Sequence, residues 1–311
     1  MRVHTIEPSR ETLHGLFSRD LPPALTVDPG DAVVFRTLDA GWGLEPPTAP
    51  GAGRRRFGDA RPEWRGDGHA LCGPIAVNGA EPGMVLEVRV GELRPGRWGW
   101  THAGGPYSHL NRRLGVADRE ELLVWTLDPD LLVGRDQHGH TVGLRPFLGV
   151  LGMPPAEPGD HPTRPPRATG GNVDCKELVA GSSLFLPVAV PGGLLSVGDG
   201  HAAQGDGEAG GQAIECPIER GELVLLLHET LRLTTPRAKT PAGWLTLGFD
   251  PDLNEATAVA VDAMLDLLGE LMGVDRHTAL ALASVAVDLR VTQVANEVWG
   301  VHALLPHGAV R

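Results

Sequence analysis

Short apolar stretches, many of them alternating with polar residues, run through the first half of the chain between glycines and prolines. Residues 85–90, Val-Leu-Glu-Val-Arg-Val, have the period of two expected for a strand with one buried face. The same order of short strand, Pro-Gly turn and second strand occurs twice, over 25–35 and 75–90. Because proline presets φ and glycine supplies positive φ in tight turns, each phrase predicts a hairpin. Two such hairpins predict a β-barrel or sandwich.

Further apolar runs predict strands in the rest of the chain, at 143–152, 183–190, 222–228, 289–295 and 298–305. Residues 120–127 fit either a strand or a short helix. The run 222–228 is almost continuously apolar, which predicts a strand buried on both faces. Residues 41–68 are rich in Gly, Pro and Arg without apolar periodicity, and they predict a long loop or lid.

The periodicity changes near the C-terminus, where apolar residues over 259–271 recur at spacings of three and four. We expect Asn254 to cap the start of this helix and Gly273 to end it. Asp275 offers a second N-cap before the apolar positions of 279–287. The predicted fold is therefore mainly β with α, a β-barrel or sandwich core with a late αα-hairpin packed on one side.

A length of 311 residues suits one large domain or two small ones. The Pro-rich stretch 153–167 divides the chain into a β-rich N-terminal subdomain, 1–152, and a second subdomain, 153–311. The second subdomain carries a β-sandwich, the helical hairpin and a Gly-Asp-x-His segment. We expect both to be integrated in one domain.

Composition excludes some functions. The chain has 39 acidic and 27 basic residues, a formal charge of −12, and no Lys/Arg run beyond 54–56, which argues against nucleic-acid binding. No stretch approaches eighteen consecutive apolar residues, so we predict neither a signal peptide nor a membrane span. Three cysteines are too few and too separated for a disulfide framework or a Cys-rich zinc site, which favours a reducing, cytoplasmic location.

Candidate chemistry concentrates in the glycine-threaded segment 197–208, which carries Asp199, His201, Asp206 and Glu208. Carboxylate and imidazole ligands suit zinc, manganese or iron, and the absence of thiolates favours an open catalytic site. Glu215 follows in an apolar stretch, where a buried charge requires a partner. A solvated turn or a calcium loop is the competing interpretation, although the segment lacks the EF-hand order of ligands.

Two other segments offer single candidates. Residues 170–174, Gly-Gly-Asn-Val-Asp, place Asp174 as a possible ligand and Asn172 as a residue that could orient one. The competing interpretation is an Asx-turn at the start of a strand. His69 stands ahead of 73–75, and a lone histidine is more often a surface or capping residue.

Several of these motifs, in this order, resemble the acetamidase/formamidase family: residues 73–83, 145–150, 170–174, 197–208 and 284–290. The resemblance implies a mainly β, metal-assisted enzyme that hydrolyses a small carboxylic amide to the acid and ammonia and forms dimers or larger oligomers. His69, Asp174, Asp199 and His201 stand where the family pattern has them. Met84 departs from it, because the family commonly has Asp after Pro-Gly.

The resulting hypothesis assigns a role to each candidate. A divalent metal ion, zinc favoured, is bound by Asp174, Asp199, His201, His69 and Glu215, the last either as a ligand or as support. Glu208 transfers the proton, Asp206 and Gln204 belong to the catalytic group, and Asn172 and Trp100 bind substrate. The partners we expect are a small amide and further copies of the chain, as a homodimer or higher oligomer, and neither nucleic acid nor membrane.

Two alternatives remain open. A cysteine nucleophile could be Cys175, beside Lys176 and Glu177, but adjacent side chains of a strand point to opposite faces and cannot all converge on one atom. A non-catalytic β protein that binds a divalent metal or carbohydrate is the other alternative. Calcium with every coordination position filled would favour that binder, whereas zinc with an open position would favour the hydrolase.

Overall fold

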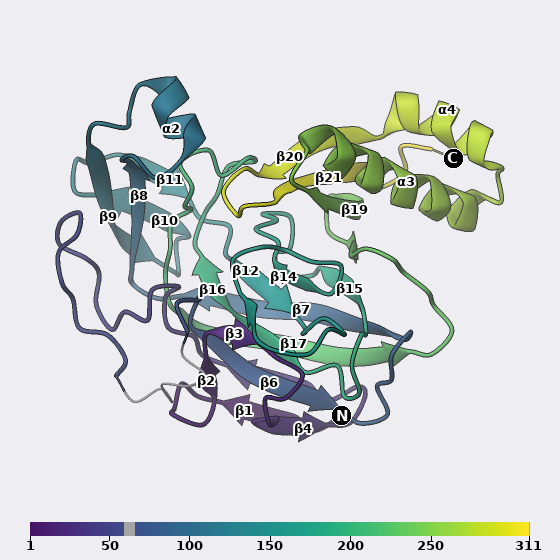
Figure 1. The fold of residues 1–311 in the computed structure, drawn as a ribbon, viewed down its shortest axis with the longest axis horizontal. Helices are drawn as coiled ribbons and strands as arrows, with labels where there is room; N and C mark the ends of the chain where they lie inside the picture. The colour runs from purple at the N-terminus through teal and green to yellow at the C-terminus, as the bar shows by residue number, and fades with distance from the viewer. Residues whose placement is uncertain (59–65, 311) are drawn as a thin grey trace.

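Two large β-sheets packed face to face form the core of the protein in a computed structural model that describes residues 1–58 and 66–310 (Figure 1). The described part of the predicted loop 41–68 contains no named strand or helix, only an isolated bridge between Gly43 and Arg56. The part of that prediction that falls on 59–65 lies outside the described residues.

The larger sheet has nine strands in the order β1-β5-β17-β7-β15-β18-β19-β21-β20. Their bounds are β1 Val3–Ile6, β5 Ala32–Phe35, β7 Val85–Pro95, β15 Ser183–Pro187, β17 Ile218–His228, β18 Arg237–Lys239, β19 Gly243–Asp250, β20 Asp288–Gln293 and β21 Trp299–Pro306. All of its pairs are antiparallel except β1 with β5. The prediction for 222–228 was wrong in one respect, because β17 alternates between buried and partly exposed residues.

The second sheet runs in the order β14-β12-β16-β6-β2, with β4 paired parallel to β6. Its strands are β2 Leu13–His14, β4 Leu25–Val27, β6 Leu71–Val77, β12 Phe147–Gly152, β14 Gly170–Asn172 and β16 Leu195–His201. Every residue of β12 and β16 is buried, because both strands lie inside this sheet and under other segments of the chain. A short pair, β3 (Leu16–Phe17) with β13 (His161–Pro162), lies beside it.

Neither predicted hairpin forms. The turn after β4 and the turn after β6 each carry the chain from the second sheet into the nine-stranded sheet, where β5 and β7 both pair with β17. Pro-Gly chemistry reverses the chain without fixing its pairing partner, so the same turn can join two layers. The apolar faces of the two sheets meet in one core, to which the following residues contribute: Ile75, Leu86, Val88, Leu148, Leu151, Val197, Leu223 and Leu225.

Two helices cover the end of the nine-stranded sheet formed by β19 and β21 (Figure 1). The helix α3 (Leu253–Met272) ends at Gly273, and α4 (Arg276–Ala286) begins after its N-cap Asp275, as predicted. The predicted N-cap Asn254 is wrong: Asp252 has the extended backbone of an N-cap, and its side chain accepts a hydrogen bond from the Asn254 amide. A Cβ at Gly248 of β19 would collide with the backbone of α3, so glycine permits the close packing.

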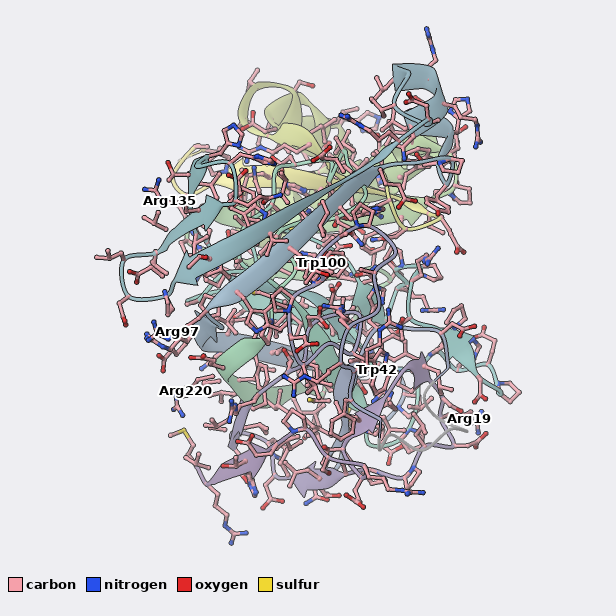
Figure 2. The ribbon with its side chains drawn as sticks, turned by 90° about the vertical axis from the view of Figure 1, so that its left-hand side faces the viewer. Arg19, Trp42, Arg97, Trp100, Arg135 and Arg220 are labelled. Carbon is pink, nitrogen blue, oxygen red and sulfur yellow. The ribbon has the colours of Figure 1, made fainter. Side chains whose placement is uncertain are left out.

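A four-stranded antiparallel sheet, in the order β11-β10-β9-β8, flanks the sandwich. Its strands are β8 Trp98–Gly104, β9 Glu120–Asp128, β10 Val133–Asp136 and β11 Thr141–Gly143, with the short helix α2 (His109–Leu114) between β8 and β9. Residues 120–127 are therefore strand. Figure 2 views the molecule from the side of this sheet, with Trp100 of β8 labelled.

The predicted fold class, mainly β with a late αα-hairpin on one side, is confirmed. Strands from 1–152 and from 153–311 alternate within both large sheets. Among the described residues, none of the helices is both long enough and apolar enough to cross a membrane.

Candidate metal centre

Asp199 and His201 come from β16, a central strand of the second sheet. Two residues apart on a strand, they face the same side. Asp174 lies two residues after the end of β14, which joins the same sheet through β12. Glu215 is held by backbone bridges to His201 on one side and Trp100 of β8 on the other. Neighbouring strands thus bring together side chains that are far apart in the sequence.

The imidazole of His201 lies at the centre of the cluster. Its Nε2 is 3.3 Å from Asp199 Oδ1 and 3.3 Å from Glu215 Oε2, and its Nδ1 is 3.7 Å from Asp174 Oδ1. Phe147 contacts the ring edge-on, with centroids 5.0 Å apart. Two sets of candidate ligands share this histidine, one with Asp174 and Asp199 and one with Glu208 and Glu215.

Gly149 of β12 lies directly against this cluster. A Cβ built on it would lie 2.5 Å from Asp199 Oδ2, closer still to Asp174 Oδ1, and 2.9 Å from the His201 ring. Any side chain at this position would therefore displace the candidate ligands. Glycine here leaves room for the two carboxylates to converge.

Two amide side chains orient the cluster. Gln204 Oε1 is 3.0 Å from His201 Nδ1, while Gln204 Nε2 donates to the backbone carbonyl of Asp174. Because an amide oxygen only accepts, His201 Nδ1 carries a proton and donates it to Gln204. On the other side, Asn296 Nδ2 donates to Asp174 Oδ2 at 2.5 Å.

Glu208 reaches the cluster from a loop that is fastened to the end of β20. The Gly207 amide donates to the Thr292 carbonyl, and the Val294 amide donates to the Gly207 carbonyl, both at 3.0 Å. Glu208 has φ of +43°, as does Asp174, and Asp199 has +57°. Left-handed backbone is unfavourable for residues other than glycine and is typical of functional sites. The strain at three neighbouring acids supports a functional cluster.

Burial determines the electrostatics. It raises the pKa of Asp174, where nearby His201 works in the opposite direction, and raises the pKa of Glu215 to about 8. Burial and the charge of Asp174 raise the pKa of Glu208 well above its usual range. Burial also works to raise the pKa of Asp199, but the charges of His201 and His69 outweigh it and lower that pKa. The pKa of His201 rises despite burial, because Glu215 and Asp199 stabilise its charged form.

The same acids fit a divalent cation. Among the described residues, Asp174 Oδ1, Glu208 Oε2 and Glu215 Oε2 are buried oxygens that accept no hydrogen bond. Unpaired carboxylate oxygens are costly to bury unless they are protonated or bind a cation. Oxygen and imidazole donors at mutual distances within 4.8 Å suit a divalent metal ion.

A cavity of about 320 Å³ opens onto the cluster. Its lining includes Asp174, Asp199, His201, Glu208 and Glu215, as well as Asn172, Asn296 and His69. Asn172 Oδ1 is buried and, within the described part of the chain, has no hydrogen-bond partner. The volume suits a small molecule with its reacting group at the acids.

Three predicted residues belong to neither set of candidate ligands among the described residues. The His69 imidazole Nδ1 bonds to Thr163 Oγ1 at 2.8 Å, and His69 belongs to neither set of candidate ligands among the described residues. The Trp100 indole N–H donates to Asp39 Oδ2, and the Arg54 guanidinium lies over the indole ring. Trp100 lines two neighbouring cavities. Asp206 pairs with Lys176 at 2.9 Å and is missing from the described lining of the 320 Å³ cavity.

Cys175 does not have the character of a nucleophile. It is completely buried, and burial raises the pKa of its thiol to about 12. Glu177, its other supposed partner, pairs with Arg145 and Arg290 instead. A protonated, inaccessible thiol cannot attack a carbonyl.

Sequence reasoning missed Asn296 and Gln212. Asn296 holds Asp174, and the turn that presents it is set by Gln293, whose Oε1 accepts the amides of Ala295 and Asn296. Gln212 lines the cavity beside its two glycine neighbours. Neither lies in a segment with ligand-like spacing, so no local signal distinguished them.

Comparisons with known proteins find chains of similar sequence and fold. A model of the acetamidase/formamidase family matches residues 156–219, the segment that carries Asp174 to Glu215. A putative formamidase of Schizosaccharomyces pombe is 29% identical, over 81% of this chain and 76% of that protein. A formamidase of Methylophilus methylotrophus is also 29% identical over 63% of this chain, which spans only 59% of that protein.

A solved structure has a similar fold. The crystal structure of an acetamidase from Bacillus halodurans superposes with a TM-score of 0.84 and 25% identity, covering 97% of each chain. The predicted resemblance to the acetamidase/formamidase family is thus confirmed.

Proposed function

We propose that the protein is a metal-dependent amidohydrolase that cleaves a small linear carboxylic amide, of the formamide or acetamide type, to the carboxylate and ammonia. The observation that carries the proposal is the group of four buried carboxylates around His201 at a 320 Å³ cavity. So many acids in one buried place favour a cation there and disfavour a purely structural role.

Asp174, Asp199 and His201 would hold the metal ion, with Glu215 as a further ligand or support. We favour zinc, because its sites combine carboxylate and imidazole donors. A divalent cation in this position supplies Lewis acidity, which polarises a carbonyl and makes water a stronger acid. His69, bonded to Thr163 at the cavity edge, is the weaker candidate ligand.

The chain's own residues have separate tasks. Amide resonance makes ammonia a poor leaving group, so a proton must reach the nitrogen as the C–N bond breaks. Glu208 is suited to this transfer, because burial keeps its carboxyl group ready to carry a proton and its Oε2 faces no competing donor among the described residues. Asn172 Oδ1, a buried acceptor in the cavity wall, would receive an N–H of the substrate.

Gln204 has a positioning task, since it fixes His201 and the Asp174 backbone together. The three described cysteines are free and buried, which supports a reducing, cytoplasmic setting. We also propose that the chain forms a homodimer or higher oligomer, as the family resemblance implies.

Elemental analysis combined with ammonia release from formamide and acetamide tests this function. We expect the purified protein to contain a stoichiometric divalent metal, zinc in the favoured case. Chelation should abolish turnover, and added Zn²⁺ should restore it, because polarisation of the carbonyl depends on the ion. A metal-free protein that hydrolyses amides at the same rate would contradict the proposal, and tightly held calcium without turnover would favour the non-catalytic binder.

Replacement of Cys175 by Ala separates metal from cysteine chemistry. Removing a true nucleophile lowers kcat by on the order of 10⁶-fold. We expect Cys175→Ala to retain kcat/KM for acetamide and its metal content, because the thiol of the parent is buried and its pKa of about 12 keeps it protonated at neutral pH. Loss of turnover with unchanged metal content and melting temperature would restore the cysteine mechanism.

A further inference from the structure

An ion pair joins the loop that carries Asp174 to the loop that carries Glu208. Lys176 Nζ lies 2.9 Å from Asp206 Oδ2, and the two side chains are 22% and 27% exposed. Lys176 stands two residues after Asp174, and Asp206 stands two residues before Glu208. Neither partner belongs to the described lining of the 320 Å³ cavity. The pair therefore lies beside the acid cluster and outside the space that a substrate would fill.

Lysine is rare in this chain. Only Lys176 and Lys239 are lysines, and the other basic residues are arginines. The lysine ammonium is a compact charge on a flexible stem, which can reach one carboxylate oxygen without the planar geometry of arginine. Among the described residues, Asp206 is the one ion-pair partner of Lys176, whereas the neighbouring Glu177 pairs with arginines. Removing the lysine charge therefore breaks this ion pair and spares the adjacent ones.

The turn before Glu208 has much conformational freedom of its own. Asp206 stands between two glycines and is the only residue of 205–207 with a side chain. Gly207 has φ of +93°, and Glu208 itself has +43°. A residue other than glycine keeps such a backbone only where its surroundings hold it. Backbone bonds to 292–294 hold Gly207, and the Asp206 carboxylate adds a side-chain contact to the loop of the other acid.

Asp174 and Glu208 depend on this ion pair to different degrees. Asp174 is also held by Asn296, which donates to its carboxylate, and by Gln204, which donates to its backbone carbonyl. Glu208 Oε2 accepts no hydrogen bond among the described residues, so the position of this carboxyl group follows from that of its backbone. Loss of the ion pair should therefore displace Glu208 and leave Asp174 in place.

We infer that Lys176 and Asp206 are positioning residues, whose ion pair sets the distance of Glu208 from Asp174 and holds the Glu208 carboxyl group at the leaving nitrogen of the substrate. Asp206, which the sequence placed in the catalytic group, thus acts through Glu208. This inference rests on the proposed amide hydrolysis and on the proton transfer assigned there to Glu208.

The test measures kcat and KM for acetamide in the full chain loaded with Zn²⁺, together with zinc affinity by titration of the metal-free protein. Lys176→Met removes the charge and keeps a long stem. Its kcat should fall by about 10- to 100-fold, because a small displacement of a catalytic group costs up to about 100-fold. KM and zinc affinity should stay close to those of the parent. Asp206→Asn, which removes the other charge, should have the same effect, and Lys176→Arg should recover most of kcat.

Two double variants show through which residue the pair acts. Lys176→Met combined with Asp206→Asn should have the kcat of the more impaired single variant, because the effects of residues in contact are not additive. In the Glu208→Gln background, Lys176→Met should lower the residual kcat no further, because no acid remains to be displaced. A lysine that only stabilised the fold would lower kcat by the same factor in both backgrounds.

Hydrogen exchange and a matched lysine variant complete the test. In metal-free Lys176→Met, the amides of 205–208 should exchange faster than in the parent, while those of 170–174 should keep their protection. Lys239→Met changes the other lysine, on β18 and outside the described lining of the 320 Å³ cavity. It should match the parent in kcat, zinc affinity and exchange at 205–208.

A parent-like kcat in both Lys176→Met and Asp206→Asn, or additive effects in either double variant, would overturn the inference and leave the proposed function intact. Loss of zinc binding in Lys176→Met would also overturn it, because the ion pair would then support Asp174. Absence of ammonia release by the parent with both formamide and acetamide would overturn the proposed function, and the inference with it.

Discussion

Gly149→Ala is expected to weaken metal binding strongly. Its methyl carbon would lie 2.5 Å from Asp199 Oδ2 and closer to Asp174 Oδ1, so both carboxylates would have to move away from His201. Strand β12 is buried on all sides and cannot shift to relieve the collision. We expect the dissociation constant for Zn²⁺ to rise by about 100-fold or more, at the upper end for changes around metal ligands. Metal titration of the apo-protein measures it, and amide turnover should fall in parallel.

The matched control is Gly143→Ala on β11 in the flanking sheet. Among the described residues, nothing lies within 4 Å of a Cβ there, so metal affinity and turnover should equal those of the parent. Thermal unfolding of apo-Gly149→Ala reports how much the collision costs the fold itself. Parent-like zinc affinity in Gly149→Ala would mean that the ion lies elsewhere and that the buried acids have another purpose.

Glu208→Gln is expected to retain the metal and lose turnover. The amide has the size of the carboxyl group but cannot carry a proton to the leaving nitrogen, and a general acid–base residue contributes about 10²- to 10⁴-fold. We expect kcat for acetamide to fall by about 10³-fold at neutral pH, with the zinc content unchanged. Steady-state ammonia release and elemental analysis of the same preparation give both numbers.

The comparison for Glu208→Gln is Glu121→Gln, the same change at an exposed position of β9. That variant should be indistinguishable from the parent. If Glu208→Gln loses zinc together with activity, Glu208 is a ligand of the second candidate set, with His201 and Glu215, and the proton carrier must be sought elsewhere.

Local sequence patterns predicted most strands and helices well, but they predicted poorly which strands pair with one another. Alternation located β7, the Pro-Gly turn beside an apolar run located β5, and the Asx residue before Arg276 located the start of α4, because these signals depend on neighbouring residues alone. Which sheet a strand joins depends on distant segments. Both Pro-Gly turns were therefore interpreted as hairpins, although each leads from one sheet to the other.

The residues of the candidate site also differ in whether the sequence predicted them. Asp174, Asp199, His201, Glu208 and Glu215 were predicted from clustering of ligand-type residues and from family resemblance, and the structure brings them together. Asn296 bonds to Asp174 over a separation of 122 residues, which no spacing rule within a segment could anticipate. Gln212 lines the cavity without ligand-like spacing around it. Asp206 has a ligand-type carboxylate and lies among predicted site residues in the sequence, but its carboxylate forms an ion pair with Lys176.

The two crossings between sheets also have a kinetic consequence. Chains dominated by contacts between remote segments fold slowly, because loop closure must precede any stabilising contact. Here β12, which carries Gly149, pairs with β16, which carries His201, and β16 pairs in turn with the distant β6. Assembly of the site therefore depends on such remote contacts, and a fragment beginning after residue 152 would lack β12, the strand against which the acids converge.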